Sequence, residues 1–126
     1  MSHTILIAAA AAAAATLTIP SGQTMLFRIE RGRPVAVRQV APTTAPARGE
    51  IRFTVKAMMG TMLTVINNSP TAYTFRATLV AADGKAMVAN SCVLPAGNRL
   101  AMENWPQQAV AVRVGDFRPT RAANCR

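Results

Sequence analysis

Apolar and polar residues alternate along most of this chain, which is the pattern of β-strands that bury one face and expose the other. The clearest case is residues 50–57, where every second residue is apolar, namely Ile51, Phe53, Val55 and Ala57. No stripe with the helical period of 3.6 residues extends beyond two turns. The sequence therefore predicts an all-β fold.

Turn residues divide the alternating segments into short strands. Gly32-Arg33 separates two segments of a predicted hairpin, and Asp83-Gly84 is a strong two-residue turn signal. The segments predicted as strands are 25–30, 35–40, 50–57, 61–66, 72–81, 85–94, 99–105 and 110–114. Seven or eight short antiparallel strands at this spacing predict a single β-sandwich of immunoglobulin-like type.

An alanine-rich apolar stretch from Ile5 to Ile19 precedes these strands. It is shorter than the roughly 20 residues that a membrane-spanning helix needs, and it leads into Pro20-Ser21-Gly22-Gln23. This arrangement predicts a helical signal peptide over residues 1–22, cleavage between Ser21 and Thr24, and a β-sandwich domain over 23–126. The alternative interpretation is a buried alanine-rich helix. A signal peptide implies a periplasmic or secreted protein without a membrane span after cleavage.

The formal net charge of +9 comes from 14 basic and 5 acidic residues. All of these residues follow the apolar stretch, so the charge belongs to the predicted exported domain. Such a surplus favours partners that are acidic, either a protein or an anionic component of the cell envelope. Because most of the basic residues are arginine, compositional bias is an alternative explanation.

Cys92 and Cys125 are the only cysteines and both follow the apolar stretch. Two cysteines in an oxidising compartment usually pair. Closing the loop of about 33 residues between Cys92 and Cys125 would add roughly 3–4 kcal/mol to the free energy of unfolding in the chain-entropy model. We therefore predict a disulfide between them. A metal or redox role is disfavoured, because the spacing is not C-x-x-C.

Five basic residues share the outward-facing parity of the predicted strands and form the candidate binding set. They are Arg28, Arg52, Lys56, Arg76 and Arg113. Aromatic residues at the opposite, inward parity are expected in the core rather than stacked on bases, so nucleic acid is not an expected partner.

Catalytic and metal-binding chemistry is poorly represented. The only histidine is His3, and the acidic residues are scattered, although Glu103 and Asp116 could converge in space. Met58, Met59 and Met62 could bind Cu(I), but methionine is also a core filler. We therefore expect a protein that is not an enzyme and that uses no cofactor or metal.

The segment from Leu63 to Phe75, the Asp83-Gly84 turn, residues 94–100 and the valine-rich segment 110–114 together resemble the N-terminal domain of periplasmic pilus-assembly chaperones. The resemblance covers about half of the predicted domain and implies an immunoglobulin-like fold, without transferring any functional residue. The sequence as a whole leaves three functional hypotheses. The first is a non-catalytic exported module that binds its partner through a basic surface, and the second is an assembly subunit that pairs through an exposed edge strand. The third, which we favour least, is an enzyme whose carboxylates come together in space.

Overall fold

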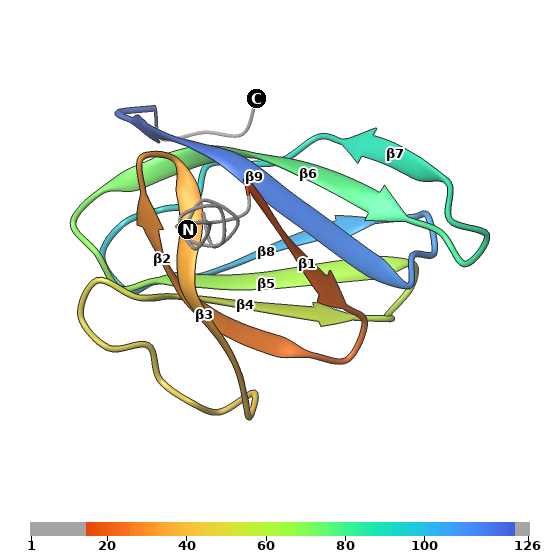
Figure 1. The fold of residues 1–126 in the computed structure, drawn as a ribbon, viewed down its shortest axis with the longest axis horizontal. Helices are drawn as coiled ribbons and strands as arrows, with labels where there is room; N and C mark the ends of the chain where they lie inside the picture. The colour runs from red at the N-terminus through yellow and green to blue at the C-terminus, as the bar shows by residue number, and fades with distance from the viewer. Residues whose placement is uncertain (1–14, 123–126) are drawn as a thin grey trace, which may run out of the picture.

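The computed structural model describes residues 15–122, which form nine strands and no helix (Figure 1). In chain order these strands are β1 (Thr16–Pro20), β2 (Thr24–Glu30), β3 (Arg33–Val40), β4 (Ile51–Lys56), β5 (Thr61–Asn67), β6 (Ala72–Val80), β7 (Ala86–Ala89), β8 (Leu100–Trp105) and β9 (Ala111–Thr120). Among these residues no helix is long and apolar enough to cross a membrane.

The strands form two antiparallel sheets. One sheet has four strands in the order β1-β9-β6-β7, and the other has five in the order β3-β2-β4-β5-β8. The β2–β3 hairpin is present as expected, with Glu30 opposite Arg33. The all-β prediction is therefore confirmed, as two sheets that share one core.

Strand β1 is the largest difference from the sequence interpretation. The sequence places these residues in the signal peptide. In the structure the whole of β1 pairs with the first half of β9, from Thr16 opposite Gly115 to Pro20 opposite Ala111. Leu17 and Ile19 point into the core, where Ile19 is fully buried. The folded unit therefore includes residues 16–22, whereas residues 1–14 of the predicted signal peptide lie outside the described part of the chain.

The core is built around four phenylalanines, two from each sheet. Phe27 and Phe53 pack edge to face with ring centroids 5.1 Å apart, and Phe75 stacks on Phe117 at 5.7 Å. The two pairs meet where Phe53 lies 5.5 Å from Phe75. Aromatic pairs at these separations add to the free energy gained from apolar burial, so this cluster joins the two sheets.

A β-bulge in β9 brings the β2–β3 turn against the four-stranded sheet. The register with β6 shifts between Arg76, which is opposite Gly115, and Thr74, which is opposite Arg118. Asp116 adopts a positive φ of 52° at this bulge. The extra residue changes the alternation so that Phe117 enters the core, and its backbone N–H donates to the Gly32 carbonyl at 3.1 Å.

The loop 41–50 between β3 and β4 covers part of the outer face of the five-stranded sheet. Leu26 is opposite the outward-facing Arg52 and outside the main core, yet it is fully buried. Arg52 donates to the Thr44 carbonyl at 2.9 Å, and Asn68 donates to the Pro46 carbonyl at the same distance. These hydrogen bonds fasten the loop to the sheet.

Candidate functional site: an arginine-lined pocket

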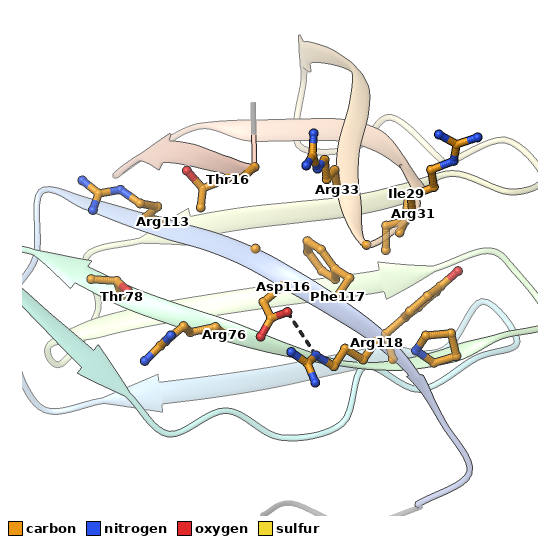
Figure 2. Close-up of a pocket in the computed structure, with 15 residues that line it drawn as sticks. Thr16, Ile29, Arg31, Arg33, Arg76, Thr78, Arg113, Asp116, Phe117 and Arg118 are labelled. Atoms are coloured by element: carbon orange, nitrogen blue, oxygen red, sulfur yellow. Dashed lines mark hydrogen bonds and ion pairs between the residues drawn. The ribbon is translucent and has the colours of Figure 1, made fainter. Parts of the chain in front are cut away.

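A pocket of about 700 Å³ lies where the outer face of the four-stranded sheet meets the β2–β3 turn. Three parts of the fold line it (Figure 2). They are the start of β1 with Ala15 and Thr16, the β2–β3 hairpin with Ile29 and 31–33, and the β6–β9 pair with Tyr73, Arg76, Thr78, Arg113 and 115–119. This volume is within the range of small-ligand sites in proteins.

Gly115 leaves the hollow over the sheet open. It lies on the outer face between Thr16 of β1 and Arg76 of β6. A Cβ atom at this position would lie 2.9 Å from both the Ala15 carbonyl oxygen and the Thr16 Cγ2 atom. Glycine therefore lets β1 approach β9 closely and places no side chain on the floor of the pocket.

The lining is strongly basic. It contains five arginines and a single acidic residue, Asp116, which leaves a surplus of four positive charges. Asp116 accepts a hydrogen bond from the Arg118 Nε at 3.1 Å, with both side chains exposed. Within residues 15–122, the other four arginines of the lining form no ion pair or side-chain hydrogen bond, and these are Arg31, Arg33, Arg76 and Arg113.

Part of the lining, the apolar side, consists of Ile29, Tyr73, Phe117 and Pro119. Ile29 and Tyr73 are half-buried there, and the Tyr73 ring meets the buried Phe117 ring edge to face at 6.4 Å. Pro119 is the cross-strand partner of Tyr73 and is exposed. Figure 2 shows Arg76 and Arg113 on one side of Phe117 and Ile29 on the other. Arg31 lies beside Ile29 in the same view, so the apolar side is flanked by arginine as well.

The structure divides the five predicted binding residues between two sheets instead of placing them on one face. Arg76 and Arg113 line the pocket, because β6 and β9 are neighbours in the four-stranded sheet. Arg28, Arg52 and Lys56 lie on β2 and β4 of the five-stranded sheet. Alternation along a strand predicts which residues face outward, but it does not predict to which sheet the strand belongs.

Two of the residues on the five-stranded sheet have structural partners. Arg28 donates to the Arg48 carbonyl at 3.1 Å, and Arg52 donates to the Thr44 carbonyl. Both carbonyls belong to the loop that covers this face. These two arginines therefore hold the loop. Within residues 15–122, the Lys56 side chain forms no hydrogen bond or ion pair.

Sequence reasoning missed three arginines of the pocket, Arg31, Arg33 and Arg118. The first two flank Gly32 in the hairpin turn, where counting by strand parity does not apply. An Arg-Gly-Arg turn beside outward-facing arginines was the signal available in the sequence. Arg118 follows the bulge in β9, which shifts the alternation by one residue.

The two carboxylates considered for catalysis have different surroundings. Glu103 lies on β8 and accepts a hydrogen bond from the Cys92 backbone N–H at 2.9 Å, and burial raises its pKa to about 7. Asp116 lies in the arginine-lined pocket, whose lining does not include Glu103. No group of three or more His, Cys, Asp or Glu residues that could hold a metal ion occurs between residues 15 and 122.

The predicted disulfide joins one described residue, Cys92, to Cys125, which lies outside the described residues. Cys92 lies in the segment between β7 and β8. The pairing of Cys92 with Cys125 stays a prediction.

Comparisons with protein-family models, with curated proteins and with solved structures found no match.

Proposed function

We propose that this protein is a non-catalytic binding module that holds an anionic group of an envelope component or of an acidic protein in its arginine-lined pocket. The observation that carries the proposal is the set of four arginines around the pocket that have no ion-pair or side-chain hydrogen-bond partner in the described chain. The apolar leader-like run at the N-terminus supports action in the periplasm or outside the cell.

Like charges gathered at one pocket favour an anionic ligand. Each guanidinium group offers several N–H donors in a planar fork that matches the oxygens of carboxylate and phosphate groups. At about 4 Å, a pair of opposite charges near a protein surface attracts by about 4 kcal/mol before desolvation and ordering costs are subtracted. The attraction is screened over about 8 Å at physiological ionic strength, so binding should weaken as salt is added.

An immunoglobulin-like type remains our proposal for the fold. The two antiparallel sheets over one aromatic core support it. One feature departs from the constant-type immunoglobulin arrangement, in which the last two strands share a sheet. Here β8 and β9 lie in different sheets. We carry over no functional residue from the chaperone resemblance.

An assembly subunit is the second candidate, and strand β8 favours it. This strand is at the edge of the five-stranded sheet, and Leu100 and Met102 are each 61% exposed on it. Exposed apolar edge strands are sites at which another chain can add a strand. Size-exclusion chromatography over a range of concentrations tests this candidate. It predicts that copies of the chain associate as the concentration rises and that Leu100→Lys abolishes this association.

Calorimetric titration with pyrophosphate at low ionic strength tests anion binding at the pocket. The double variant Arg76→Glu/Arg113→Glu should weaken binding by at least about tenfold, because it replaces two attractions by two repulsions. The matched control is Lys56→Glu/Lys85→Glu, which changes the net charge equally at two exposed residues outside the pocket.

The control should keep the affinity within about twofold, since its charges are farther from the pocket and screened. If both double variants lost affinity for pyrophosphate equally, net charge alone would explain the loss, and the pocket would not be the binding site. The absence of pyrophosphate binding to the parent protein would overturn it as well.

A further inference from the structure

We infer that the ligand of the arginine-lined pocket is amphipathic, with a phosphate or carboxylate group attached to a hydrocarbon group. This inference rests on the proposed function, because it concerns the same pocket. It adds that the apolar side of the pocket contributes to affinity.

The pocket leaves apolar surface open to water. Ile29, Tyr73 and Pro119 come from three different strands, and none of them is buried. Covering apolar surface stabilises a complex in proportion to the area that is removed from water. A small inorganic anion that is held by the arginines would leave this area exposed, whereas a hydrocarbon group would cover it.

Strand β6 contributes both charged and apolar residues to the lining. Tyr73, Arg76 and Thr78 of this strand all line the pocket. Arg76 and Thr78 share the outward parity, whereas Tyr73 has the opposite parity and packs against the core. Two residues lie between Tyr73 and Arg76, and the three steps along an extended strand correspond to about 10 Å between their Cα atoms. A ligand with its charge at one end and its hydrocarbon at the other can therefore contact both the arginines and the apolar residues at once.

The fold holds both the arginines and the apolar residues of the pocket in place. Tyr73 packs on Phe117, and its backbone forms two hydrogen bonds with Leu94, at 3.1 and 2.8 Å. The β2–β3 hairpin carries Ile29 and Arg33. Its turn is held by the hydrogen bond that the Phe117 N–H donates to the Gly32 carbonyl. A site that is formed before binding loses less conformational entropy when the ligand arrives.

Calorimetric titration of the full chain with methyl, butyl and hexyl phosphate tests the inference. Affinity should rise along the series by about twofold to fourfold for each methylene that the apolar side covers. Acetate and hexanoate form a parallel pair that separates the preference for phosphate from the preference for carboxylate. Neutral 1-hexanol should bind much more weakly than hexyl phosphate, because it offers nothing to the arginines.

Two variants locate the gain. Tyr73→Ser and Pro119→Ser should each reduce the ratio of hexyl to methyl phosphate affinity while leaving methyl phosphate binding within about twofold. The second variant covers the case in which Tyr73→Ser fails to fold, since Pro119 is exposed. Leu100→Ser is the matched control, because it removes an exposed apolar side chain from the other sheet and should not change the ratio.

The outcomes separate this inference from the proposed function. Equal affinity for methyl and hexyl phosphate would overturn the amphipathic ligand and leave the anion pocket standing. Failure of every phosphate and carboxylate to bind would overturn both. If 1-hexanol bound as tightly as hexyl phosphate, the arginines would not contribute to binding. If the ratio of hexyl to methyl phosphate affinity were unchanged in both Tyr73→Ser and Pro119→Ser, the apolar side would not contribute.

Discussion

The two outer faces of the sandwich carry arginines in different circumstances. On the five-stranded sheet, Arg28 and Arg52 donate to loop carbonyls, and Arg38 forms an ion pair with Glu50 at 3.2 Å. On the four-stranded sheet, Arg76 and Arg113 have no such partner in the described chain. The same residue type at the same strand parity thus serves structure on one face and is available for binding on the other.

The two faces differ in whether a loop of the chain covers their arginines. The connection 41–50 between β3 and β4 runs over the five-stranded sheet and brings carbonyl oxygens and the Glu50 carboxylate to its arginines. The corresponding place on the four-stranded sheet holds Gly115 and the open pocket. Unpaired donors beside an open pocket are a better indication of a ligand site than the number of arginines alone.

The largest expected effect concerns β1, which forms both an edge of the four-stranded sheet and a wall of the pocket. Deleting residues 1–22 removes Leu17 and Ile19 from the core, at a cost of about 1.5–3 kcal/mol for each side chain, and exposes the edge of β9. Against a typical total stability of about 5–15 kcal/mol, this should lower the melting temperature severely or prevent folding.

Deletion of residues 1–14 is the matched control because it keeps β1, and it should melt at a much higher temperature in circular dichroism than deletion of residues 1–22. Equal melting of the two truncated proteins would contradict the role of β1. Because cleavage between Ser21 and Thr24 would remove this strand, we expect any leader cleavage to occur before Thr16. The intact mass of protein recovered from the periplasmic or secreted fraction checks this position.

The next effect compares single arginines on the two faces. Arg52→Ala should destabilise the protein by about 1–2 kcal/mol, because it breaks the bond to the Thr44 carbonyl that helps to hold the covering loop. Arg76→Ala should change the free energy of unfolding by less than about 0.5 kcal/mol, as at exposed sites without a partner. Urea unfolding measures both values. A larger loss for Arg76→Ala would mean that this arginine also serves structure.

A smaller effect concerns pH and the loop on the five-stranded face. The Ala47 N–H donates to the Glu50 carboxylate at 2.8 Å, and this bond, together with the Arg38 guanidinium, lowers the pKa of Glu50. Because the pKa is lower in the folded state, the stabilisation is present above the unfolded value of about 4.5 and is lost as the pH falls through the folded pKa.

Glu50→Gln should therefore be less stable than the parent at pH 7, and the difference should shrink toward pH 3. Thermal melts at several pH values test this expectation. A constant difference across this range would show that the charge of Glu50 does not fasten the loop.

The extent of sequence-based prediction can be traced to particular residues. The β2–β3 hairpin and β4 were predictable because their alternation is regular and their turns are marked by Gly32 and the proline-containing loop. Strand β1 was not recognised, since Leu17 and Ile19 continue an alanine-rich apolar run that is typical of a leader. In the pocket, Arg76 and Arg113 were predicted as outward-facing. Their separation from Arg28 and Arg52 required the pairing of distant strands, which alternation does not encode.

The most direct test of the difference between the two faces is a ¹⁵N–¹H NMR titration of the protein with pyrophosphate. The account predicts that backbone amide shifts change around the pocket, at Gly32, Arg76, Arg113 and Gly115, and stay nearly constant at Arg28 and Arg52. Changes that centre on Arg28 and Arg52, or that spread evenly over both sheets, would contradict the assignment of the anion site to the arginine-lined pocket.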